Sequence, residues 1–276
     1  MGPQARVEKI AGGFQFTEGP VFSRIGFLLF SDIPAERIVK YDFPPGQPGP
    51  GNGELSVFRE KSNRANGLTF DHQGRLLTCE GGAGRVTRTE KDGRITVLAE
   101  RFEGRSLNAP NDLVYAIEGS VYFSDLRPRN AATDPSKIDF SAVYQITRKG
   151  EVRIATREPD RPNGVALSPN QLTLYVADSA RQQVWAFEIA GDGSLSKGRA
   201  VAELKSEAPG AADGLKTDEA GNIYVAGPGG VWVFTATGKR LGTIAVPETP
   251  SNCAWGRGFS GLYITARTSI YYIPTK

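Results

Sequence analysis

Six polar residues with oxygen-bearing side chains recur along this chain, about 40 to 50 residues apart, and each opens a short apolar stretch. These anchor residues are Glu18, Asn66, Asn111, Asn163, Asp213 and Asn252. Carboxylate and amide oxygens are the donors that calcium takes in sets of about six to eight. If the six converge, Glu18 and Asp213 would neutralise a divalent charge. Asn111 and Asn163 would add carbonyl oxygens, and further positions would stay open for water or substrate.

The elements that must position these residues are short strands. A repeat of about 40 to 50 residues built from short strands is typical of a β-propeller. Roughly 14 residues after most anchors a second apolar strand ends, often in an acid such as Glu80 or Asp125. Each repeat therefore begins with an antiparallel hairpin, which places the anchors and these acids on one face. The turn tips lie on the other face.

Third strands follow in all six repeats, but a fourth strand follows in only five. A spare strand over residues 7–10 precedes the first repeat, so we expect it to pair with the last one. The predicted fold is all-β: a six-bladed β-propeller closed by an N-terminal strand completing the last blade. We expect one domain over residues 1–276. The alternative is an irregular β-sandwich.

Charge and composition narrow the range of partners. The chain has 33 basic and 30 acidic residues, a net charge of +3, which gives no electrostatic case for nucleic acid or an anionic membrane. No apolar run approaches the roughly 18 residues of a membrane span, and the first residues lack an apolar signal core. Cys79 and Cys253 are expected to be buried and reduced. We expect a cytoplasmic monomer or dimer that binds a small molecule.

Structural alternatives exist for several of these residues. Asn-Gly and Asp-Gly pairs also form ordinary turns, and Asn66 and Asn252 are the weaker ligand candidates. His72 is expected at a turn tip on the face away from the anchors. With one histidine and two cysteines in the chain, neither a Ser-His-Asp triad nor a typical nitrogen- or sulfur-ligated zinc site is credible.

Four segments together resemble the gluconolactonase and senescence-marker-protein (regucalcin) family, and in particular bacterial-type gluconolactonases. They are residues 16–20 (FTEGP), 109–112 (APND), 161–166 (RPNGVA) and 212–214 (ADG), and the resemblance runs from about residue 14 to 274. It implies a six-bladed propeller with a divalent cation, usually calcium, on the axis. By these motifs Glu18, Asn163 and Asp213 would be metal ligands. Asn111 would contact the metal or the substrate.

Two loops depart from the pattern of many relatives. Gly81 follows Cys79-Glu80, where many have histidine, and residues 125–129 read DLRPR, where many have a Pro-Pro-Tyr/Trp-Gly-like run. Both loops are expected at the rim of the pocket. The departures leave the predicted metal site intact and leave the identity of the substrate open.

The resulting hypothesis is a metal-dependent lactonase that acts on a sugar-derived or similar small lactone. The cation, calcium first with zinc, magnesium or manganese as alternatives, would polarise the lactone carbonyl. Asp213 is the candidate to position or deprotonate the attacking water. Alternatively, metal-bound hydroxide is the nucleophile and Asp213 is only a ligand.

The candidate substrate contacts share a position at the expected mouth of the channel. They are Asn66, Asn111, Glu80, Asp125, Arg127 and Arg129. The two arginines belong to a long loop over residues 126–141, which we expect to form a wall or lid. The rival functions are an esterase or phosphotriesterase at the same site, a non-catalytic calcium-binding propeller, and a metal-free synthase.

Overall fold

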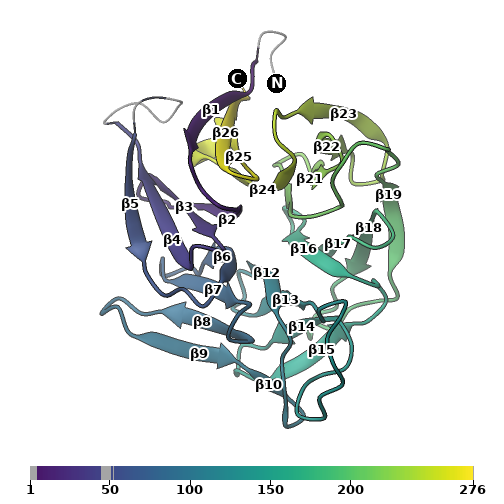
Figure 1. Cartoon of the computed structure of the whole chain (residues 1–276). Helices are drawn as coiled ribbons and strands as arrows, with labels where there is room; N and C mark the ends of the chain where they lie inside the picture. Colours follow the sequence, from purple (N-terminus) through teal and green to yellow (C-terminus); the bar gives the residue numbers. More distant parts are fainter. Residues whose placement is uncertain (1–4, 45–50, 52, 276) are drawn as a thin grey trace.

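The structure is a computed structural model that describes residues 5–44, 51 and 53–275. The described residues form six four-stranded antiparallel sheets around a central axis, together with one two-stranded hairpin (Figure 1). This arrangement confirms the predicted six-bladed β-propeller. The helical structure in the described part is a 3-10 turn, η1 (Arg257–Phe259). No described helix has the length and apolar character needed to cross a membrane.

In the first three blades the strands follow one another from the axis to the periphery in the order of the chain. Blade 1 contains β2 (Thr17–Phe22), β3 (Phe27–Asp32), β4 (Arg37–Asp42) and β5 (Glu54–Arg59). Blade 2 contains β6 (Ala65–Phe70), β7 (Leu76–Glu80), β8 (Arg85–Thr89) and β9 (Ile95–Ala99). Blade 3 contains β12 (Pro110–Tyr115), β13 (Val121–Asp125), β14 (Ala142–Ile146) and β15 (Val152–Thr156).

The remaining three blades are built in the same way, except that an N-terminal strand is outermost in the last one. Blade 4 contains β16 (Pro162–Leu167), β17 (Thr173–Asp178), β18 (Gln183–Glu188) and β19 (Arg199–Glu203). Blade 5 contains β20 (Leu215–Thr217), β21 (Ile223–Gly227), β22 (Gly230–Phe234) and β23 (Arg240–Ala245). Blade 6 contains β24 (Pro250–Trp255), β25 (Gly261–Ala266), β26 (Ser269–Pro274) and β1 (Glu8–Gly12).

The N-terminal strand closes the ring, as predicted. β1 pairs antiparallel with β26, with Glu8 opposite Tyr272 and Gly12 opposite Ser269. The first described strand therefore becomes the outermost strand of the last blade (Figure 1). Pairing the two ends of the chain in one sheet keeps the ring from opening between its first and last blades.

Apolar side chains on both faces of each blade pack against the neighbouring blades. Between blades 4 and 5, one buried cluster includes Tyr175, Val184, Leu215, Val225 and Trp232. The second strands β7 and β13 are buried along their whole length because their sheets are covered on both faces. Burial of one large apolar side chain contributes about 1.5–3 kcal/mol. This packing therefore holds the innermost strands in fixed positions around the axis.

A short hairpin that the sequence did not predict redirects the long loop over residues 126–141. Its strands are β10 (Arg101–Phe102) and β11 (Arg105–Ser106), and β10 contacts β15 at the outer edge of blade 3. Ile138, which is 1% exposed, donates its N–H to the Ser106 carbonyl over 3.0 Å. The second half of the loop therefore lies against the outer edge of the blade. The expected lid over the mouth is wrong for this half of the loop.

Candidate metal and substrate site on the propeller axis

The anchor residues lie on the innermost strands, which surround the axis (Figure 1). Glu18 is in β2, Asn66 in β6, Asn111 in β12, Asn163 in β16 and Asn252 in β24, while Asp213 precedes β20 by two residues. Five of the six therefore lie within strands. The alternative that the Asn-Gly pairs form ordinary turns is wrong for Asn66 and Asn163. His72, in contrast, lies in the exposed turn between β6 and β7, at the other end of the strand from Asn66.

β-bulges change the direction of the side chains at the anchors. The pairing of first and second strands is irregular at five of them, and the shifts lie between Glu18 and Val21, Ala65 and Leu68, Pro110 and Leu113, Pro162 and Val165, and Pro250 and Asn252. A bulge turns side chains away from strict alternation and is common beside functional sites. Consecutive residues such as Asn111 and Asp112 therefore need not point to opposite faces.

The glycines that follow four anchors allow adjacent inner strands to approach closely. A Cβ atom on Gly164 would lie 2.5 Å from the Asp213 carbonyl oxygen. A Cβ atom on Gly214 would lie 1.9 Å from Cγ of Asn252. Only a residue without a side chain fits at such separations. The glycine in these motifs thus reflects convergence of the strands on the axis.

Two carboxyl groups among the anchors, Glu18 and Asp213, are in surroundings that disfavour their charged forms. Glu18 is 4% exposed. Burial, followed by repulsion from Asp112, raises its pKa to about 7. Burial, followed by repulsion from Glu18 and Asp112, raises the pKa of Asp213 well above its usual value. Bringing these acids together favours either protonation or a bound cation.

Three amide oxygens of the same ring lack partners. Oδ1 of Asn66, Asn111 and Asn163 is buried and has no hydrogen-bond donor among the described residues. The Nδ2 of Asn163 donates to Ser179 Oγ over 3.1 Å, so the nitrogen of this amide has a hydrogen-bond partner and its oxygen has none. A buried unpaired oxygen costs about 1–3 kcal/mol, so three in one ring call for a ligand. Carboxylates with amide oxygens fit a hard divalent cation.

The donor set is mixed and not purely acidic. Across the described parts of the chain, no group of three or more His, Cys, Asp or Glu side chains is arranged to hold a metal. Both cysteines are free and buried, as predicted. Burial raises the pKa of Cys253 to about 12, so its thiol stays protonated and is a poor metal ligand. Oxygen atoms are thus the ligands that this axis offers to a metal.

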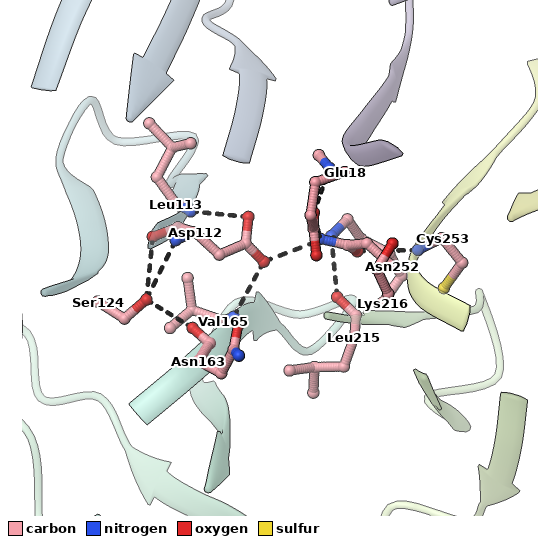
Figure 2. A network of polar contacts seen from close by, with 12 residues as sticks. Glu18, Asp112, Leu113, Ser124, Asn163, Val165, Leu215, Lys216, Asn252 and Cys253 are labelled. Carbon is pink, nitrogen blue, oxygen red and sulfur yellow. Dashed lines mark hydrogen bonds and ion pairs between the residues drawn. The ribbon is translucent and has the colours of Figure 1, made fainter. Parts of the chain in front are cut away.

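Two further charged residues on the axis were missed in the sequence. Asp112 is 2% exposed, and Lys216 Nζ lies 3.9 Å from its Oδ2 (Figure 2). The same Nζ donates to Asn252 Oδ1 over 3.3 Å and to the Leu215 carbonyl over 3.0 Å. Lys216 could have been selected from the sequence, because a lysine in a short inner strand is a charged residue close to the axis. Asp112 was concealed by the bulge between Pro110 and Leu113.

The family follows from the sequence match. The sequence model of the SMP-30/Gluconolactonase/LRE-like region matches residues 2–268 of this chain. The chain belongs to the SMP-30/gluconolactonase/LRE-like family. A gluconolactonase from Zymomonas mobilis is 30% identical to it, over 98% of this chain and 81% of the relative. Human regucalcin is 24% identical, over 90% of this chain and 82% of the relative.

Solved structures of the SMP-30/gluconolactonase family share the architecture. A gluconolactonase from Xanthomonas campestris superposes with a TM-score of 0.86 at 29% identity, covering 99% of this chain and 90% of its own. A calcium-binding regucalcin from Agrobacterium tumefaciens gives a TM-score of 0.78 at 18% identity. It covers 98% of this chain and 93% of its own, and at that identity it supports the fold alone.

Glu80 and Asp125, at the ends of the second strands, hold neighbouring segments together through hydrogen bonds. Glu80 is 0% exposed, and its carboxylate accepts from Asn63, Arg85 and Thr87, each over 2.8 Å, and from Arg59. Substrate contact by Glu80 would require these bonds to break.

Asp125 is enclosed in the same way. It is 0% exposed, and its Oδ2 accepts from both nitrogens of Asn108, over 2.9 Å from the backbone and 3.1 Å from the side chain. Burial raises its pKa to about 6. Its Oδ2 therefore fixes the loop that leads into β12, while its Oδ1 is buried without a partner among the described residues. Contact between Asp125 and a ligand stays a prediction.

Arginines gather where the long loop leaves β13. The Arg127 guanidinium donates to the Ala131 carbonyl over 3.1 Å, and Arg129 is exposed. Arg161, two residues before Asn163, donates to the Arg127 carbonyl over 3.3 Å. Burial, and then repulsion from Arg129, lowers the pKa of Arg161. Arg161 was not selected from the sequence, although it belongs to the motif that contains Asn163.

Proposed function

We propose that this protein is a divalent-cation-dependent lactonase that hydrolyses a sugar-derived or similar small lactone. The observation that carries the proposal is the set of anchors itself: a buried and a half-buried carboxylate with raised pKa values, Glu18 and Asp213, and three buried amide oxygens without donors on the inner strands. The relatives support the substrate class, since they include the Zymomonas gluconolactonase and a pentonolactonase from Haloferax volcanii that is 26% identical.

Four residues are proposed to hold the cation. Glu18, Asn163 and Asp213 would be ligands, and Asn111 would be a fourth ligand or a substrate contact. All four offer oxygen, which favours calcium over softer metals, with magnesium, manganese and zinc as alternatives. A cation held here would supply Lewis-acid chemistry, since it would polarise an ester carbonyl and offset the negative charge that develops on its oxygen.

Asp213 is proposed to handle the proton. As a ligand of the cation, its carboxylate would lie where it can accept a proton from the water that attacks the lactone carbonyl carbon. The acyl C–O bond of the ring then breaks, and the departing oxygen takes that proton back. The product is a hydroxy acid. A hydrogen bond from Asn163 lowers the Asp213 pKa and holds the carboxylate in one orientation.

The proposed substrate contacts are two residues of the inner strands and two of the loop over residues 126–141. Asn66 and Asn111 present free amide oxygens on the axis. Arg127 and Arg129 would reach hydroxyl or carboxylate groups of the lactone from the loop. We also propose a cytoplasmic monomer or dimer whose partner is the small lactone. Nucleic acid and membrane are not proposed as partners, because basic and acidic residues are nearly balanced.

A pH-indicator assay tests the proposal. The protein is supplied with D-glucono-1,5-lactone and related five- and six-membered lactones, with calcium, magnesium, manganese or zinc, and after chelation. Acid release that stops after chelation and returns with calcium is expected. Asp213→Asn should lose at least 100-fold in kcat, while Asp160→Asn, an exposed control, should not change it. Full activity in Asp213→Asn would overturn the role of Asp213, and turnover unaffected by chelation would overturn metal dependence.

A further inference from the structure

Lys216 occupies a pocket of oxygen atoms on the channel axis. Its Nζ lies 3.0 Å from the Leu215 carbonyl oxygen, 3.3 Å from Asn252 Oδ1 and 3.9 Å from Asp112 Oδ2. These atoms come from blades 5, 6 and 3, so the ammonium joins elements that are far apart in the sequence (Figure 2). The side chain is 27% exposed, which leaves the ammonium only partly hydrated.

The three oxygens around Lys216 are of the kinds that bind hard cations. They are a carboxylate, a side-chain amide carbonyl and a backbone carbonyl, which together make up the usual protein ligands of calcium. In this channel a side chain of the protein itself supplies the positive charge at their centre. The ammonium thus supplies the positive charge that a free cation would bring to these oxygens.

The charge of Lys216 compensates a buried acid. Asp112 also accepts the N–H of Leu113 over 2.9 Å and the N–H of Val165 over 3.3 Å, but neither group carries a charge. Asp112 also repels Glu18 and Asp213, raising the pKa of both. Without Lys216, the positive charge beside Asp112 and Glu18 would be missing. A buried carboxylate without a counter-charge is strongly destabilising.

Lys216 also fixes the orientation of an amide in the ring. Asn252 Oδ1 accepts from both Lys216 Nζ and the Cys253 N–H, the latter over 2.8 Å. With Oδ1 held by two donors, Nδ2 points the other way and donates to Glu18 Oε2 over 3.0 Å. Lys216 is therefore a positioning residue for Glu18, acting through Asn252.

We propose that Lys216 is a tethered cation that fills a second cation site of the axial channel, formed by Asp112, Leu215 and Asn252. The first cation site is the one proposed at Glu18, Asn163 and Asp213. Only the existence of that first site rests on the proposed function. Replacing Lys216 with an uncharged side chain of similar length should open the second site to a divalent cation.

The test counts bound calcium in four proteins by equilibrium dialysis and metal analysis. Lys216→Met should bind one calcium per chain more than the unaltered protein. Lys216→Arg keeps the charge and should bind the same number as the unaltered protein. The double variant Lys216→Met/Asp112→Asn removes the acid of the second site and should lose the additional calcium. An unchanged count in Lys216→Met would overturn the proposal.

Unfolding midpoints provide the second readout, independent of activity. In a chelator, Lys216→Met should unfold at a lower temperature than Lys216→Arg, and calcium should raise its midpoint by more than it raises that of the unaltered protein. A Lys216→Met variant that folds only with calcium supports the proposal, and one that calcium does not rescue contradicts it. If the unaltered protein binds no calcium, calcium is not the cation of the anchor site, but the additional calcium in Lys216→Met still decides the role of Lys216.

Discussion

Asn252 donates from Nδ2 to Glu18 Oε2 over 3.0 Å, and this bond joins the last blade to the first at the axis. The same two blades are joined at the periphery, where β1 pairs with β26. The ring is thus closed twice, once by backbone pairing and once by a side-chain bond to a proposed metal ligand. Closure of the fold and orientation of Glu18 are linked through one amide.

The first prediction concerns this amide. Asn252→Leu removes the bond while keeping the volume of a side chain that is 1% exposed. Because the bond lowers the pKa of Glu18, its loss should raise that pKa above about 7. A hydrogen bond to a charged group contributes about 1.5–3 kcal/mol, so calcium affinity should fall at least tenfold near pH 7.

Calorimetric titration with calcium measures this effect. Asn222→Ala is the matched control, because Asn222 donates to Asp218 at the β20–β21 turn, on the face away from the anchors. Equal affinities for Asn252→Leu and the control would show that the Asn252 bond does not hold Glu18 for the cation.

The second prediction is a pH dependence of stability set by Glu18. Its pKa is about 7 in the folded protein, against 4.5 as its ordinary value. The folded state therefore binds the proton more tightly than the unfolded state does. The stabilisation from this proton is complete below about pH 4.5 and is lost as the pH rises to about 7, at most roughly 3 kcal/mol. The raised pKa of Asp213 acts in the same direction.

Denaturant unfolding in a chelator between pH 5 and 8 checks this prediction. Glu18→Gln should show a shallower fall in the free energy of unfolding than the unaltered protein, because the amide does not titrate. Calcium should restore more stability at pH 8 than at pH 5, since it competes with the proton for the same carboxylates. Parallel pH profiles for the two proteins would show that Glu18 does not titrate in this range.

Much of the fold could be predicted from the sequence, because period and polarity are properties of local segments. The third strands predicted in all six repeats are present as β4, β8, β14, β18, β22 and β26. The missing fourth strand of the last repeat led directly to the pairing of β1 with β26. The hairpin β10–β11 was missed because its strands are two residues long, too short to show a pattern.

The site was less predictable, because its details depend on contacts between distant segments. A bulge decides that Asp112 meets Lys216, and strict alternation along a strand cannot reveal it. Glu80 is adjacent to an expected pocket loop, but Arg59 reaches it from the end of β5 and Asn63 from the connection between blades 1 and 2. No local feature of the sequence around Glu80 shows that these donors surround it.

The third prediction separates the two roles of Glu80. Glu80→Gln keeps the shape of the side chain but removes the charge that faces Arg59 and Arg85. Loss of one partner of a buried ion pair costs about 3–5 kcal/mol, so the free energy of unfolding should fall by about that amount. KM for the lactone should stay unchanged. Glu60→Gln, at an exposed position, is the control and should leave both values unaltered. A raised KM with normal stability would instead support the substrate contact predicted from the sequence.

The fourth prediction tests whether the glycines keep the inner strands converged. Gly164→Ala places a Cβ atom 2.5 Å from the Asp213 carbonyl oxygen and 2.7 Å from Gly214 Cα, and both contacts are with backbone. The backbone of blade 5 must move away, which should cost about 1–3 kcal/mol and displace Asp213. Gly191→Ala is the matched control, because a Cβ atom there meets nothing within 4 Å. Calcium affinity and unfolding midpoint should both fall in Gly164→Ala and stay near normal in the control. If the two alanine variants behave alike, close approach of β16 to the residues before β20 does not set the geometry of the ring.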